Sequence, residues 1–147
     1  MTLHELNTLS QQQLVTELTN CCGSTAWVYK MLPFFPADDL VELLEDAEEQ
    51  WYQCSPIDWK EAFTRHSTIG YVKDASSQII HELTTATQQY ESRFGYPFII
   101  SDTAQSTEEI LSLLKERSSN DPDDEIEIAA DEQNKITKQR IEKLLDE

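Results

Sequence analysis

The stretch YESRFGYPFII, from Tyr90 to Ile100, marks the point where helical patterning gives way to a short run of β-forming residues. Up to Phe94, apolar residues recur at helical spacing, and Gly95 has the backbone freedom to end such a helix. Tyr96 to Ile100 is the only stretch rich enough in β-formers to be extended. Because this stretch is short and helical periodicity prevails elsewhere, we predict an all-α fold.

Capping signals and apolar periodicity predict about seven to eight helices in a single domain over residues 1–147. The predicted starts are Leu3, Ser10, a buried segment within 22–36, Asp38 or Asp39, Asp58, Ser76 or Ser77, Thr107 and the turn at Asn120-Asp121-Pro122. The helix that starts at Asp38 or Asp39 carries many acids mainly off its apolar stripe, which is typical of a solvated face.

The composition fits a globular protein with one core. The chain has 147 residues, of which 39% are hydrophobic, and its mean hydropathy is -0.53. A chain of this length can bury the core of one domain but hardly of two. The net charge of -17 argues against binding to nucleic acid and to anionic membranes, which both require basic side chains.

The apolar runs and the first 13 residues predict where the protein is located. No apolar run approaches the roughly 18 residues of a membrane span, and residues 1–13 do not resemble a secretory signal. Cys21, Cys22 and Cys54 are odd in number, and two of them are adjacent, which argues against a disulfide framework. We therefore expect a cytoplasmic protein with buried free thiols.

The sequence lacks the spacings of common metal and cofactor sites. His4, His66 and His81 are not spaced as a helical ligand pair, and there is no Cys-x-x-Cys motif. The carboxylates lack the calcium-loop spacing. With three glycines in the chain, phosphate-binding and dinucleotide-binding loops are also absent. These observations favour chemistry without a metal or cofactor, or plain binding.

His66 is the candidate for proton transfer. It begins the motif His-Ser-Thr-Ile-Gly, residues 66–70, directly after an amphipathic stretch that contains Trp59. Histidine exchanges protons near neutral pH, and loops on a rigid scaffold often carry chemistry. A histidine that only ends a helix would look the same in the sequence, so the wider order of motifs decides between these interpretations.

That order runs through the whole chain. It comprises Cys22-Gly23-Ser24-Thr25-Ala26-Trp27, Phe34-Phe35-Pro36, Trp51, residues 66–70, residues 90–100, Glu125-Ile126 through Ala129-Ala130, and the closing pattern Glu132-Gln133-x-Lys135-Ile136-x-x-x-Arg140-Ile141. The series resembles the 2-oxo-4-hydroxy-4-carboxy-5-ureidoimidazoline (OHCU) decarboxylase family of urate catabolism. The resemblance implies an all-helical enzyme without a cofactor, often a homodimer, that decarboxylates this ureidoimidazoline to (S)-allantoin.

The resemblance also implies site residues. The catalytic histidine of the family falls on His66, as general acid and base. Ser67 stands where family members usually have Pro, and it leaves a hydroxyl near the site. Ile100 and Ser101 match the stretch whose backbone groups hold the substrate ring. Arg140 matches an arginine suited to grip a carboxylate or a ring carbonyl with paired donors.

The chain departs from the family pattern in one segment. Family members carry a longer stretch after the His-x-x-Ile-Gly motif, with a Glu-Gln pair whose Glu works with the His. Here only residues 71–78 bridge this gap, and Asp74 is the only acid among them. Asp102, which follows Ser101, adds a negative charge near an anionic substrate.

Three hypotheses follow from these observations. The first is a decarboxylase of this family. The second is a member with impaired catalysis that binds a ureide or another protein, because the Glu-Gln segment is missing. The third is a purely structural interaction module whose acidic face at residues 38–49 docks a basic partner. Joint retention of His66 and Arg140 disfavours the third hypothesis.

Overall fold

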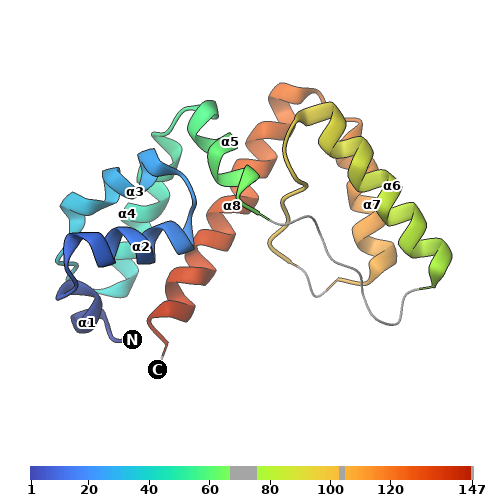
Figure 1. Ribbon diagram of the computed structural model, residues 1–147. Coiled ribbons are helices and arrows are strands. Elements are labelled where there is room, and N and C mark those ends of the chain that lie inside the picture. The colour runs from blue at the N-terminus through green and yellow to red at the C-terminus, as the bar shows by residue number, and fades with distance from the viewer. Residues whose placement is uncertain (67–75, 103–104, 147) are drawn as a thin grey trace. The chain divides into compact units, whose positions relative to one another are not determined.

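A computed structural model of the chain describes residues 1–66, 76–102 and 105–146. These residues form eight α-helices and one 3-10 helix and include no strand, which confirms the all-α prediction (Figure 1). The helices are α1 (Leu3–Asn7), α2 (Gln11–Cys21), α3 (Thr25–Met31), α4 (Leu40–Tyr52), α5 (Pro56–Thr64), α6 (Ser77–Phe94), α7 (Thr107–Ser118) and α8 (Pro122–Leu144), with the 3-10 helix η1 at Leu32–Phe34.

Polar residues begin most of these helices at or beside the predicted positions. The hydroxyls of Ser10 and Ser76 accept the backbone N–H groups of the third helical residues of α2 and α6. The Asp39 carboxylate accepts Glu42 N–H at 2.7 Å at the start of α4. Gly95 ends α6 with φ at 85°, a left-handed conformation that glycine adopts without steric cost. Short polar side chains therefore set the boundaries that the sequence predicts.

The chain divides into two compact units, residues 1–62 with 133–147 and residues 63–132. The predicted single domain over residues 1–147 stays a prediction, and each unit is described by itself. The first unit contains α1 to α4, most of α5 and the second half of α8. The second contains α6, α7 and the first half of α8.

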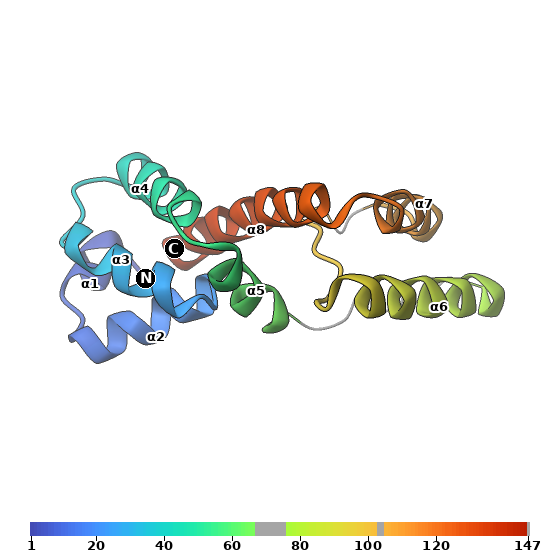
Figure 2. The same ribbon diagram turned by 90° about the horizontal axis from the view of Figure 1, so that it is seen from above.

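The first unit is built around large apolar side chains on α2, α3 and α4. Trp27 is fully buried and donates its indole N–H to the Ala47 carbonyl at 3.0 Å, which ties α3 to α4. Figure 2 shows α4 beside the second half of α8, where Glu48 accepts from Asn134 at 2.8 Å and from Lys138 at 2.9 Å. Hydrogen bonds from Lys138 and Asn134 lower the pKa of Glu48.

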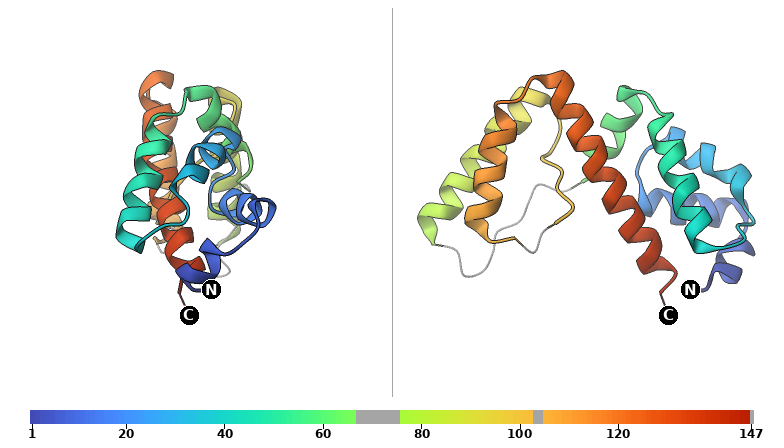
Figure 3. Two further views of the ribbon diagram at one scale, coloured as in Figure 1. Left: turned by 90° about the vertical axis from the view of Figure 1, so that its left-hand side faces the viewer. Right: turned by 180° about the vertical axis from the view of Figure 1, so that it is seen from behind.

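The termini of the first unit lie together (Figure 3). The amino group of Met1 donates to the Leu144 carbonyl at the end of α8 over 2.9 Å. The acids Glu42, Glu45 and Glu49 of α4 are exposed, while its buried residues are Leu43, Ala47, Gln50 and Trp51. The predicted solvated face of this helix is thus confirmed.

The three cysteines are free and buried in the same unit, as predicted. Burial raises the pKa of Cys21 and of Cys54 to about 11 and that of Cys22 to about 12. A thiol with so high a pKa stays protonated near neutrality, and a thiol is a poor nucleophile. These cysteines therefore act as small core residues.

The second unit pairs α6 with α7 and carries the segment between them. The two helices lie side by side in Figure 1. Tyr96 to Ile100 follows the Gly95 cap and forms neither helix nor strand, and Phe98, Ile99 and Ile100 are buried. In the residues that the structure describes, no helix is long and apolar enough to cross a membrane.

Candidate active site

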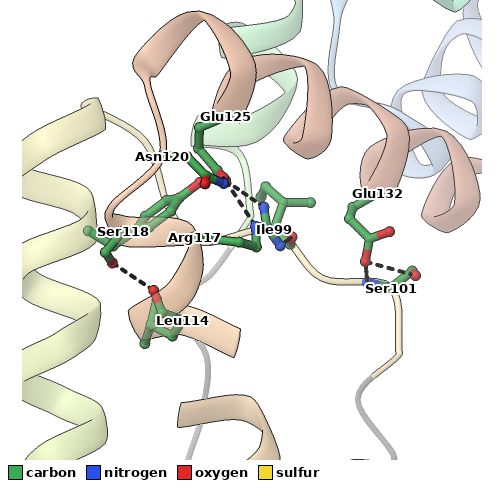
Figure 4. A network of polar contacts seen from close by, with 9 residues as sticks. Ile99, Ser101, Leu114, Arg117, Ser118, Asn120, Glu125 and Glu132 are labelled. Carbon is green, nitrogen blue, oxygen red and sulfur yellow. Dashed lines mark hydrogen bonds and ion pairs between the residues drawn. The ribbon is translucent and has the colours of Figure 1, made fainter. Parts of the chain in front are cut away.

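The segment from Ile99 to Ser101 is held at both ends by side chains from helices. Arg117 on α7 donates to the Ile99 carbonyl at 2.8 Å. Glu132 on α8 accepts the Ser101 backbone N–H at 3.1 Å and the Ser101 hydroxyl at 3.2 Å. Figure 4 shows these two anchors on either side of the segment. The backbone of the predicted substrate-binding residues Ile100 and Ser101 is therefore fixed.

The anchor at Ile99 belongs to a buried ion pair. Arg117 and Glu125 are 4% and 0% exposed, and the guanidinium donates to Glu125 Oε2 through Nε at 3.0 Å and through Nη2 at 2.7 Å. Tyr90 also donates its hydroxyl to Oε2, and Asn120 donates to Oε1 at 3.1 Å. Both oxygens of the buried carboxylate are thus hydrogen-bonded, as a buried charge requires.

Aromatic rings pack around this ion pair. The Arg117 guanidinium lies 4.3 Å from the centre of the Phe98 ring, and Tyr90 contacts Phe98 edge to face at 5.1 Å. Burial raises the pKa of Tyr96 to about 12 and that of Tyr90 further still. Both phenols are therefore neutral near pH 7, and Glu125 and Arg117 carry the charges of the cluster.

His66 lies just after α5 at the start of the second unit. Its side chain is half-buried, and its backbone N–H donates to the Phe63 carbonyl at 3.1 Å. Phe63 packs against Tyr96, with ring centres 5.0 Å apart. The backbone of His66 is thus hydrogen-bonded to a residue that packs against Tyr96, which begins the segment that carries Ile100 and Ser101.

Two predicted site residues do not join this arrangement. Ser67 lies outside the described residues, as does Asp74. Arg140 lies on the part of α8 that belongs to the first unit, where it is exposed and its Nη1 donates to the Cys21 carbonyl at 3.5 Å. The roles predicted for these residues stay predictions.

The sequence did not identify Arg117, Glu125 or Glu132 as site residues, although a signal was present. On α8, Glu125 precedes Ala129 by four residues, and on α7, Arg117 follows Leu114 by three. All four side chains are buried, so each charged residue occupies a position of the apolar stripe. A charge at a core position predicts a buried partner.

Within residues 1–66, 76–102 and 105–146, no group of three or more His, Cys, Asp or Glu side chains could hold a metal ion. The expectation that the chemistry needs neither metal nor cofactor stays a prediction. The second unit offers a backbone segment held at both ends by helix side chains and, just after α5, a half-buried imidazole.

The family model and the similar proteins agree on one family. The family model described as OHCU decarboxylase matches residues 7–142. The uric acid degradation bifunctional protein TTL of Arabidopsis thaliana is 33% identical over 146 residues, which cover 84% of this chain and 45% of that protein. The chain thus spans less than half the length of this relative. The 2-oxo-4-hydroxy-4-carboxy-5-ureidoimidazoline decarboxylase of Amia calva is 26% identical, over 99% of this chain and 95% of that protein.

Solved structures show the same likeness. A crystal structure of OHCU decarboxylase in the presence of (S)-allantoin is similar with a TM-score of 0.81 and 34% identity, over 89% of this chain and 98% of that one. A crystal structure of (S)-allantoin synthase has a TM-score of 0.84, over 99% of this chain and 55% of that one. Its identity of 15% shows a shared fold only.

Proposed function

The chain belongs to the OHCU decarboxylase family, and we propose that it converts 2-oxo-4-hydroxy-4-carboxy-5-ureidoimidazoline to (S)-allantoin in urate degradation. The observation that supports this most strongly is the family match over residues 7–142. The fixed Ile99 to Ser101 backbone adds to it, because this is the stretch that resembles the family's holder of the substrate ring.

The reaction breaks one carbon–carbon bond. The bond between the ring carbon and the carboxylate carbon cleaves, carbon dioxide leaves, and the electron pair remains on the ring, which can delocalise it. A proton then adds from one face to the neighbouring ring carbon, which bears the ureido group, while the carbon that lost the carboxylate becomes a carbonyl as its hydroxyl gives up its proton, and the S product results. The protein must orient the carboxylate, hold the ring and place the proton donor, which are positioning and general-acid tasks.

Five residues carry these tasks in our proposal. His66 is the general acid and base that protonates the carbanion. Ser67 and the backbone of Ile100 and Ser101 bind the ring. Arg140 grips the carboxylate or a ring carbonyl with its paired donors. Neither a cofactor nor a metal takes part.

The surroundings of the reaction are proposed from composition and family. The strongly acidic chain has no nucleic acid or membrane partner, acts in the cytoplasm and forms a homodimer as family members often do. Its partner in the reaction is the small ureidoimidazoline. The net charge of -17 supports the exclusion of polyanions.

A second candidate function has one specific observation in its favour. Only residues 71–78 stand where family members carry the Glu-Gln pair. A chain that lacks the Glu-Gln pair of the family would bind a ureide, or another protein, without turnover. This impaired member is the alternative that the activity assay has to separate from the decarboxylase.

The assay generates the unstable substrate in place from urate with uricase and hydroxyisourate hydrolase, and circular dichroism follows the allantoin. We expect rapid formation of optically active (S)-allantoin, which His66→Ala abolishes. His81→Ala is the matched control, because His81 lies exposed on α6 of the same unit. Racemic allantoin at the rate measured without protein would contradict the decarboxylase and favour the binding alternative.

A further inference from the structure

Glu132 binds Ser101 twice through a single oxygen. Its Oε1 accepts the Ser101 backbone N–H at 3.1 Å and the Ser101 hydroxyl at 3.2 Å. Both residues are half-buried, and Figure 4 shows the carboxylate directed at the end of the segment. The carboxylate thus fixes both the backbone and the hydroxyl rotamer of a residue that we propose to hold substrate.

The two anchors of the segment differ in their surroundings. Arg117 at the Ile99 end is 4% exposed and pairs with a fully buried carboxylate, so it belongs to the core. Glu132 is half-buried, and its carboxylate contacts both polar groups of Ser101. A carboxylate beside the proposed site of an anionic substrate also opposes binding by its charge. Attraction to the substrate charge therefore does not explain its position, whereas the two hydrogen bonds explain the fixed geometry of Ser101.

We infer that Glu132 is a positioning residue for the reaction, an inference that rests on the proposed function. It acts through Ser101: it holds the N–H and the hydroxyl so that the Ile100 and Ser101 backbone meets the ring in one orientation. A shift of about 1 Å in such a group lowers turnover roughly a hundredfold. The same ring orientation decides which face of the carbanion receives the proton, so Glu132 controls the optical purity of the product as well as its rate.

The test compares Glu132→Ala, Glu132→Gln and the control Glu127→Gln in the coupled assay. Glu127 is exposed on the same helix and loses the same charge. We expect Glu132→Ala to lower kcat/KM by about tenfold or more and to reduce the enantiomeric excess of (S)-allantoin. Glu132→Gln keeps an oxygen acceptor and should retain most of the kcat/KM and of the enantiomeric excess. Glu127→Gln should have the same kcat/KM and enantiomeric excess as the unchanged chain.

A second measurement records the contact itself. Amide hydrogen exchange at Ser101, followed by NMR, should become faster in Glu132→Ala and stay slow in Glu127→Gln, with the thermal midpoint unchanged in both. Faster exchange with unchanged turnover and optical purity would overturn the inference. Unchanged exchange at Ser101 in Glu132→Ala would also overturn it. Loss of cooperative folding in Glu132→Ala would overturn it as well, because Glu132 would then act in stability.

Failure of the proposed function gives a different pattern. An unchanged chain without turnover contradicts the decarboxylase, and titration with (S)-allantoin then decides the inference. Binding that weakens about tenfold in Glu132→Ala, but not in Glu127→Gln, supports a positioning role. Equal binding by both variants, or no binding by any chain, overturns it.

Discussion

Arg117 and Glu125 form an ion pair of 2.7 Å in which neither side chain is more than 5% exposed. The arginine donates onward to the Ile99 carbonyl, so the pair connects α7 and α8 to the segment that we propose to bind substrate. Loss of one partner would leave a charge buried without compensation. The stability of this unit and the geometry of its site therefore depend on the same interaction.

We expect Arg117→Met to lower the free energy of unfolding by about 3–5 kcal/mol, because Glu125 then remains buried and unpaired. The double variant Arg117→Met with Glu125→Leu should recover part of this loss, because the buried charge is gone while the Tyr90 hydroxyl and the Ile99 carbonyl still lose their partners. Urea unfolding followed by far-UV circular dichroism measures both. A double variant no more stable than the single one would contradict the uncompensated charge as the cause.

The matched control is Lys138→Met. Lys138 pairs with Glu48 at 2.9 Å, and the two side chains are 31% and 46% exposed. An ion pair in such a position contributes about 0–1 kcal/mol. A loss as large as that of Arg117→Met would mean that burial is not what separates the two pairs.

The two buried tyrosines of this cluster should respond differently to removal of the hydroxyl. Tyr90 donates to Glu125, whereas the Tyr96 hydroxyl makes no hydrogen bond of normal geometry among the described residues and has the Tyr90 hydroxyl as a polar neighbour. We expect Tyr90→Phe to cost about 1–3 kcal/mol and Tyr96→Phe to be neutral or slightly stabilising. Thermal unfolding of both variants under one set of conditions decides this, and equal losses would refute it.

The sequence predicts a helix boundary correctly where the capping residue bonds to a backbone group only a few residues away. Ser10, Ser76 and Gly95 cap the helices for which the sequence predicts them. The start of α5 differs from the prediction. The sequence predicts a start at Asp58, but the helix begins at Pro56, because the Asp58 carboxylate reaches back to the N–H of Ser55 at 3.1 Å. Asp58 thus lies in the first turn rather than before it.

The site was predicted less completely, for a physical reason. The resemblance to the family points to His66, Ile100 and Ser101, because each of them lies in or directly beside one continuous sequence motif. The anchors Arg117 and Glu132 contact the same segment from two different helices. Periodicity places a residue on a face of its own helix, but it does not show which distant backbone group that face meets.

Alkaline pH should weaken the fold through Cys22. Burial raises its pKa from 9.0 to about 12, so the folded chain keeps this proton while the unfolded chain loses it. The stabilisation is complete below about pH 9 and is lost as the pH rises toward 12, by about 1.4 kcal/mol per pH unit for one thiol. Unfolding free energies of the unchanged chain and of Cys22→Ala between pH 8 and 11 should therefore converge, and parallel curves would contradict this.

Arg140 provides the sharpest test of the proposed substrate contacts, because it is exposed and its replacement should not disturb the fold. If its guanidinium grips the substrate carboxylate with two parallel donors, Arg140→Lys keeps the charge but loses the paired geometry. We expect KM to rise by about tenfold or more, with the free energy of unfolding unchanged within about 0.5 kcal/mol. Lys143→Gln is the control, because Lys143 is an exposed cation on the same helix. An equal rise of KM in Lys143→Gln would show that the effect is not specific to Arg140, and an unchanged KM in Arg140→Lys would remove the paired donors from the proposed site.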